Sequence, residues 1–279
     1  MSGFIAELKN TLSELGSAFT TARPQVIGMA KKDLIKKTKK SGLGWFWLFF
    51  QPVIYILCFY LALYIGVKNT KNGLDGGAYI LWLASGVVPW WYMRSALGSG
   101  PTCFRRYSFL VTRLKFPVAL IPVFTELSTL MFQCMLVALL IGGYFLLGNP
   151  LTIYFVQLPF IMILMFIFWT GFSLMTAPLV AISDDVGQLI KALQTPIFWL
   201  SGVIFDVASL NNPLFQFLLK FDPACFFVTC YRNILSGTQA CWVWEDPGFF
   251  WLGMLTIVVT IIVGLLVYSR CRKDLADVL

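Results

Sequence analysis

Charged residues are absent from a long stretch in the middle of the chain. The 57 residues from Leu127 to Ser183 contain no Lys, Arg, Asp or Glu. About 20 apolar residues cross a hydrocarbon core roughly 30 Å thick, so this stretch is long enough for two membrane-spanning helices. Gly148, Asn149 and Pro150 lie near its middle and predict the turn between them. The pattern predicts a polytopic membrane protein.

Further apolar stretches raise the prediction to six spans in an all-α fold. The fifth stretch has only 11 residues, so its helix must include part of Lys191–Gln194 or continue past Asp206 to cross. The predicted spans lie within Ser41–Val67, Ala78–Arg94, Val118–Leu147, Thr152–Ile182, Thr195–Phe205 and Gly248–Tyr268.

The first 43 residues predict amphipathic helices instead of a span. Apolar residues recur at steps of three and four from Phe4 to Phe19, as on one face of a helix. A second helix is expected after Pro24, and its basic face is typical of helices that lie in the cytosolic membrane interface. A solvated linker with scattered lysines is the alternative. The basic face includes Lys31, Lys32 and Lys36.

The basic residues orient this arrangement. With the N-terminus inside, 17 of the 21 Lys and Arg residues fall on the cytosolic side. Both ends are therefore expected in the cytosol, with a cytosolic segment 1–43, a transmembrane domain 44–270 and a cytosolic tail 271–279. The segment from Asp206 to Asp246 is half apolar and is broken by Pro213, Pro223 and Gly237. It predicts a re-entrant element that enters the membrane from outside, between the fifth and sixth spans.

Composition agrees with membrane residence and narrows the chemistry. The chain is 58% hydrophobic and 12% charged, with a mean hydropathy of +0.79, a net charge of +8 and no histidine. The absence of histidine disfavours His-dependent proton relays, metal sites and catalytic triads. Positive-inside loops and anionic lipids explain the basic balance without a nucleic-acid partner. The seven cysteines form no CxxC spacing, and a disulfide among Cys225, Cys230 and Cys241 is one alternative left open.

Catalysis finds little support in the sequence. Glu126 is the only acidic residue within the predicted spans, and we expect it near the cytosolic end of its helix, with its carboxylate reaching water in a structural role. Asp184 and Asp185 follow Ser183 and are expected to cap and charge the start of a helix. The sequence contains no GxxxxGK[ST] phosphate loop, so this chain does not bind ATP in that mode.

Arg94 and two tryptophans are candidates for contact with a transported molecule. If the second span begins near Ala78, a rise of about 1.5 Å per residue places Arg94 about 24 Å along the helix, close to the cytosolic headgroups. Arg94 either extends to the interface there or contacts a lipid phosphate. Trp90 and Trp91 lie inside the span and fit an interfacial aromatic belt poorly. Their rings would suit a path for sugar rings or a lipid chain.

Four segments, in order, resemble one known family. They are KKSGLGWFWLFFQP (Lys39–Pro52), FLVTRLKFPVALIP (Phe109–Pro122), SDDVGQLIKALQTPIFWLSGVIF (Ser183–Phe205) and FDPACFFVTCYRNILSG (Phe221–Gly237). Together they resemble the membrane subunit of type-2 ABC exporters of lipid-linked polysaccharide, the O-antigen and teichoic-acid exporter family. Asp222 stands where that family usually has Asn, and Gly202 stands near an expected Pro.

The resemblance implies a role for each segment. The lysine-rich helix would lie beside a separate ATPase, which would bind ATP and Mg. A coupling helix would insert into that ATPase, and a second cytosolic contact would follow the fourth span. Two copies of the chain and two ATPase subunits would form the exporter in the cytoplasmic membrane, with a gate on the outer side. The implied sets are Arg105, Arg106, Arg113, Lys115 and Phe116 for coupling, Asp184, Asp185 and Gln188 for the second contact, and Phe226, Phe227, Tyr231 and Arg232 for the gate.

Other classes of membrane protein stay open as alternatives. A type-2 permease for a drug or lipid would share the fold and the coupling segments. A membrane-embedded glycosyltransferase or acyltransferase is disfavoured by the lack of histidine and of paired acids within the spans. An ion channel or secondary transporter would place charged or polar residues deep in several spans, and this chain has almost none.

Overall fold

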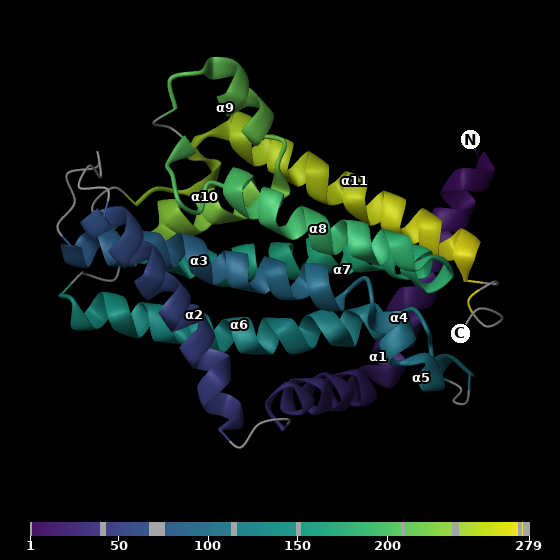
Figure 1. The fold of residues 1–279 in the computed structure, drawn as a ribbon. Coiled ribbons are helices and arrows are strands. Elements are labelled where there is room, and N and C mark those ends of the chain that lie inside the picture. The colour runs from purple at the N-terminus through teal and green to yellow at the C-terminus, as the bar shows by residue number, and fades with distance from the viewer. Residues whose placement is uncertain are drawn as a thin grey trace.

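A computed structural model describes residues 2–39, 43–66, 76–112, 116–148, 152–207, 210–235, 240–272 and 275. All regular structure in these ranges is helical, which confirms the all-α part of the prediction (Figure 1). Long helices lie alongside one another, and the short helices gather at the two ends of the bundle.

Four of the described helices are long and apolar enough to cross a membrane. A further pair, α9 (Pro213–Leu219) and α10 (Pro223–Leu235), passes the same test together but is bent by 94°, as in a broken span or a re-entrant loop. The four are Gly44–Tyr64 in α2 (Gly44–Tyr60) and the π-helical η1 (Leu61–Gly66), α6 (Leu120–Leu146), η2 (Ile153–Gln157) continued by α7 (Leu158–Ile182), and α11 (Pro247–Cys271).

Two of the six predicted spans fall outside this group. Helix α3 (Gly76–Ser99) has 24 residues, and every residue from Leu83 to Trp90 is buried. Its glycines, serines and Arg94 make it less apolar than the four spans, and polar residues of a membrane protein are tolerated where they face protein instead of lipid. Helix α8 (Asp184–Leu200) has 17 residues, so it includes Lys191–Gln194 and begins at Asp184, and it does not continue past Asp206. Six spans therefore stay a prediction.

The N-terminal segment differs from the prediction of two helices. It forms one helix, α1 (Ser2–Thr38), with Pro24 inside it. An interior proline costs roughly 3 kcal/mol because it removes one backbone hydrogen bond and crowds the preceding turn. Packing against α6 and α11 offsets that cost, since Ala22, Val26 and Ala30 are buried on this face.

Helix α2 stands partly apart from the other long helices. It runs at an angle to them, and its first turns leave the bundle (Figure 1). Trp45, Phe46 and Trp47 are 42–50% exposed there. The predicted entrance to the first span is therefore an aromatic surface on the outside of one chain.

The interior consists of two apolar cores with a polar region between them. Phe132 of α6 and Phe168 of α7 belong to the larger core. Phe124 of α6 and Leu174 of α7 belong to the smaller core, which also contains α1 and α4 (Cys103–Arg106) and lies at the end of the bundle that carries α5 (Ser108–Thr112). We call this end the α4 end. Between the cores the same helices carry polar side chains, including the buried Glu126.

Candidate functional site

At the α4 end, two of the segments predicted to contact a partner are joined directly. The guanidinium of Arg105 in α4 forms an ion pair with the carboxylate of Asp184 at the start of α8, and it also donates to the Ala181 carbonyl oxygen at 3.1 Å. Their side chains are 34% and 74% exposed, so the pair is reachable from outside. Residues 79 positions apart in sequence thus form one surface.

The start of α8 is built as the sequence predicts. The Ser183 hydroxyl oxygen accepts from the Asp185 backbone N–H, and two acidic residues in the first turn favour the positive end of the helix dipole. Asp184, Asp185 and Gln188 are all exposed. This first turn therefore presents negative charge at the α4 end.

The remaining predicted coupling residues take different positions. Phe116 is 9% exposed and packs against Phe124 in the smaller core, at 6.2 Å between ring centroids. Arg106 is exposed at the end of α4. Arg113 and Lys115 lie outside the described residues.

Helix α1 divides its lysines between two environments. Lys31, Lys32 and Lys36 are exposed, as predicted for the basic face. The Lys36 ammonium also lies over the Tyr107 ring, 5.3 Å from its centroid. Lys37, one residue on, instead faces the bundle and donates to the Thr129 hydroxyl oxygen at 3.4 Å.

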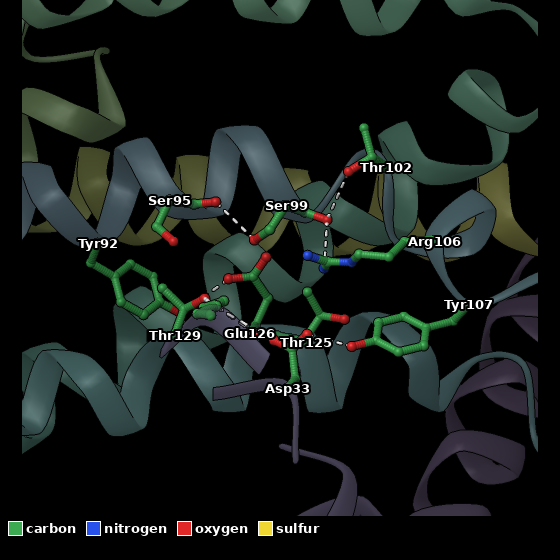
Figure 2. Close-up of polar contacts among 11 residues, drawn as sticks. Asp33, Tyr92, Ser95, Ser99, Thr102, Arg106, Tyr107, Thr125, Glu126 and Thr129 are labelled. Atoms are coloured by element: carbon green, nitrogen blue, oxygen red, sulfur yellow. Dashed lines mark hydrogen bonds and ion pairs between the residues drawn. The ribbon is translucent and has the colours of Figure 1, made fainter. Parts of the chain in front are cut away.

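Through Thr129 and Asp33, Lys37 belongs to a mostly buried set of polar residues from five parts of the chain. Figure 2 shows several members of the set, including Asp33, Glu126 and Arg106. Asp33 of α1 is 3% exposed, accepts a hydrogen bond from the Tyr107 hydroxyl and pairs with Lys37 at 3.5 Å. Arg106 donates to the Ser99 carbonyl oxygen at 3.3 Å. We call the set the polar layer: Asp33, Lys37, Tyr92, Ser99, Arg106, Tyr107, Thr125, Glu126, Ser128, Thr129 and Ser173.

Asp33 and Lys37 of the polar layer each stabilise the charged form of the other. Burial tends to raise the pKa of Asp33, but Lys37, the Tyr107 hydroxyl and Arg106 outweigh it, so the pKa lies below its ordinary value of 3.8. The ionised carboxylate therefore stabilises the fold above the ordinary pKa, and this contribution is lost as the pH falls through the lower folded value. Burial lowers the pKa of Lys37, although Asp33 opposes that shift. Burial and the bond to Asp33 raise the pKa of Tyr107.

Glu126 corrects one expectation. Its carboxylate does not reach water but is 0% exposed. It accepts from the Ser173 hydroxyl at 2.8 Å and from the Tyr92 hydroxyl at 3.3 Å. Gly100 follows α3 against this carboxylate, and a Cβ at that position would lie 2.8 Å from the Glu126 Oε1 atom and overlap Ser173. A buried carboxylate costs several kcal/mol unless donors surround it, and α3 and α7 supply them here.

Two adjoining grooves lie between α2, α3 and α8. The first, of about 430 Å³, is polar, and the second, of about 260 Å³, is aromatic. Arg94 and Gln194 line both, and the Gln194 amide donates to the Arg94 carbonyl oxygen at 3.0 Å. The polar groove is lined chiefly by Gln51, Trp91, Arg94, Ser99, Arg106 and Gln194, and the aromatic groove by Tyr55, Phe59, Trp90, Phe198 and Trp199.

The structure shows how three residues of α3, which the sequence predicts to contact a transported molecule, are distributed between the two grooves. The Arg94 guanidinium lies over the Trp91 ring, 5.4 Å from its centroid. Trp90 is 2% exposed and packs against Phe198 of α8 at 5.2 Å between centroids. Trp91 and Arg94 therefore face the polar groove, while Trp90 forms the floor of the aromatic one.

The predicted gate residues lie in the interior at the opposite end. Phe226 packs against Phe249 of α11, and Phe227 against Phe168 of α7. The Tyr231 hydroxyl accepts from the Gln133 amide at 3.3 Å. All of these aromatic side chains are buried, as are Cys225 and Cys230, and the cysteines of this segment are free thiols.

Arg232 fixes the end of α8 to α10. Its guanidinium donates to the carbonyl oxygens of Gly202 and Val203 at 2.5 Å and of Phe205 at 2.9 Å. It also lies 3.7 Å from the Trp82 ring centroid. Gly202 has a φ of +73°, a backbone conformation that favours glycine, and it ends α8 there. Arg232 therefore supplies the donors that the last carbonyl groups of this segment require.

Sequence reasoning missed the polar layer as a unit. Asp33 is the one acidic residue among the lysines of Lys31–Lys40, and its i,i+4 spacing from Lys37 was a usable signal. Ser173 and Tyr92 carried no comparable signal, because a lone hydroxyl on an apolar helix commonly bonds its own backbone.

Comparisons of the sequence with known proteins match one family and several named relatives. The sequence pattern of the ABC-2 type transporter family matches residues 24–236. An O-antigen export system permease protein RfbA from Myxococcus xanthus is 21% identical over 217 residues, covering 76% of this chain and 80% of the relative. A protein of the same name from Klebsiella pneumoniae is 18% identical over 259 residues, covering 91% of this chain and 94% of the relative.

Replacing Asp33 tests whether the polar layer holds α1 in place. Asp33→Asn leaves the Lys37 ammonium without its carboxylate, so we expect a lower unfolding temperature in detergent, equivalent to about 1–3 kcal/mol. The matched control Asp185→Asn removes an exposed carboxylate and should change stability by less than about 0.5 kcal/mol. Adding Lys37→Met to Asp33→Asn should recover part of the loss, because no buried charge is then unpaired. Wild-type stability of Asp33→Asn would contradict this account.

Proposed function

We propose that this chain, which belongs to the ABC-2 type transporter family by its match over residues 24–236, is the permease of an exporter for lipid-linked cell-envelope polysaccharide. The family makes it a multi-pass membrane transport subunit and not an enzyme, and it implies an ATPase partner. Cargo of the O-antigen, capsule or teichoic-acid type would cross the cytoplasmic membrane.

The cargo assignment rests on the extent of the similarity to O-antigen export permeases. The Klebsiella relatives align with 91% of this chain and 94% of their own length. The general family match over residues 24–236 already includes the grooves, α9 and α10, so the support for the cargo is that these relatives, aligned over nearly their whole length, are named O-antigen export permeases. It is this observation that favours a polysaccharide over a drug or a simple lipid.

The proposed topology has six spans, with α3 and α8 completing the set. Both termini lie in the cytosol, because that arrangement places 17 of the 21 basic residues inside. The α4 end is then the cytosolic end. The bent pair α9–α10 is the re-entrant element on the outer side, and its gate residues move when the path opens.

Coupling to the ATPase takes place at the α4 end. The exposed pair Arg105–Asp184 joins the coupling helix to the second contact, so a force applied at either one reaches both. Arg113 and Lys115 extend the coupling segment, and Lys31, Lys32 and Lys36 border it on α1. Two ATPase subunits hydrolyse ATP and favour alternate states of the permease by binding them with different affinity.

Two copies of the chain form the transport path. The polar and aromatic grooves open on the side of one chain beside α2, so a second copy facing them would close a path that neither copy encloses alone. The aromatic residues of α2 are exposed on this outer surface, including Trp45 and Phe46.

A charge exchange tests the coupling pair. Arg105→Glu and Asp184→Arg each place like charges together, and we expect either one to lower ATP hydrolysis by the reconstituted complex about fivefold, the effect of roughly 1 kcal/mol. The double exchange restores the pair and should recover most of the rate. The unfolding temperature should hardly change, because an exposed ion pair contributes only about 0–1 kcal/mol.

Arg270→Glu serves as the matched control, since Arg270 is an exposed arginine near the end of α11. It should leave the hydrolysis rate unchanged. A double exchange that is no better than the single variants would contradict direct coupling through this pair.

Depletion of the protein in its own cell tests the cargo. We expect lipid-linked glycan to accumulate on the cytosolic side and surface glycan to fall, and the intact chain supplied from a plasmid to reverse both. Glycolipid extraction and surface staining measure the two pools. Normal surface glycan in depleted cells would exclude polysaccharide export and leave a drug or lipid permease.

A further inference from the structure

The position of Arg106 is not explained by the exposed Arg105–Asp184 pair or by the polar layer alone. Its guanidinium donates to the Ser99 carbonyl oxygen, and its charge helps to lower the pKa of Asp33. The same side chain is exposed and, like that of Arg94, lines the polar groove. Figure 2 shows the Arg106 side chain pointing from α4 toward Ser99. Arg106 thus connects a groove with a coupling helix.

The polar groove has the chemistry of an anion site. Two guanidinium groups line it, and among its described lining residues none is acidic. Gln51, Ser95 and Gln194 add neutral hydrogen-bonding groups. Paired guanidinium groups bind phosphate oxygens with charge-assisted, often bidentate hydrogen bonds, and they do so most strongly for a ligand with several anionic oxygens.

The neighbouring surface suits a hydrocarbon chain. Arg94 and Gln194 continue from the polar groove into the aromatic groove, where Tyr55, Phe59 and Trp199 present ring surfaces. The aromatic groove lies between helices of the transmembrane bundle, so an apolar chain could leave it for the bilayer. A lipid with a phosphorylated headgroup would place its two parts in the two grooves.

We infer that the polar groove binds the diphosphate of the lipid carrier between Arg94 and Arg106, and that Arg106 reports this binding to the ATPase. The inference rests on the proposed function and names the part of the cargo that the permease recognises. Two phosphate groups match two guanidinium groups, whereas a phospholipid headgroup offers a single phosphodiester. The second copy of the chain would provide an equivalent site.

The path from groove to ATPase is short. Arg105 and Arg106 are adjacent in the four-residue helix α4. Arg105 pairs with Asp184, in the region proposed to contact the ATPase, and Arg106 lines the polar groove. A bound diphosphate would attract Arg106 away from Ser99 and turn α4 relative to α8. Cargo binding would therefore change the surface that the ATPase contacts and would stimulate hydrolysis.

The test uses the complete chain with its ATPase in nanodiscs of zwitterionic lipid. A polyprenyl diphosphate without glycan is the probe, native mass spectrometry measures its binding, and phosphate release measures hydrolysis. We expect Arg94→Gln and Arg106→Gln each to weaken binding by about tenfold or more, as the loss of a charge-assisted hydrogen bond predicts. Arg106→Lys keeps the charge and should bind with intermediate affinity.

The two variants should differ at saturating lipid. Arg94→Gln should still show stimulated hydrolysis once the groove is filled, whereas Arg106→Gln should not, because it lacks the link to α4. Arg270→Gln, the matched control, should bind and respond as wild type. Unfolding temperatures of Arg94→Gln and Arg106→Lys within about 2 °C of wild type would show that these variants are folded. Arg106→Gln also removes a positive charge from the polar layer, so we expect it to unfold a few degrees lower, and Arg106→Lys is the variant that separates this loss of stability from the loss of binding.

Three outcomes would overturn the inference. Wild-type binding by both variants would show that the guanidinium groups do not hold the diphosphate. Equal binding of phosphatidylglycerol would identify an ordinary anionic-lipid site. Equal stimulation of Arg106→Gln and wild type would remove the signalling role. Each leaves the proposed export function intact, whereas a wild-type complex that neither hydrolyses ATP nor exports glycan would contradict that function itself.

Discussion

Burial of two carboxylates is the constraint on which the arrangement of this protein depends. Glu126 and Asp33 are 0% and 3% exposed, and a carboxylate removed from water is stable only where donors and positive charge replace the solvent. The donors come from α3, α7 and Tyr107, and the positive charge comes from Lys37 and Arg106. Because these groups belong to separate elements, meeting the requirement fixes α1, α3, α4, α6 and α7 relative to one another.

This constraint also determines which movements the α4 end can transmit to the rest of the chain. Helix α4 is held from two sides, by Arg106 and the following Tyr107 in the polar layer and by Arg105 on Asp184. A short helix held in this way moves together with its partners or exchanges one set of contacts for another. The polar layer borders the polar groove through Ser99 and Arg106. The proposed cargo surface and the proposed ATPase surface are therefore separated by one turn of helix.

The sequence predicted the elements better than the contacts between them. The uncharged stretch from Leu127 to Ser183 predicted α6 and α7 because lipid imposes one rule on every exposed residue of a span. That rule says little about α3, which is largely surrounded by protein and can carry polar residues. Pro24 suggested a helix boundary that packing against α6 and α11 overrides. Glu126 was recognisable as unusual, but its burial depends on Ser173 and Tyr92, which lie 47 and 34 positions away in sequence.

The partner surface is most directly tested by a structure of the chain bound to its ATPase. Our account predicts two copies of the chain, with each ATPase subunit contacting α4 and the first turn of α8 and with Arg105 and Asp184 at the centre of the contact. The grooves of the two copies should face each other across a shared path. An ATPase seated at the α9–α10 end, or a contact that leaves α4 and Asp184 free in solvent, would contradict the account.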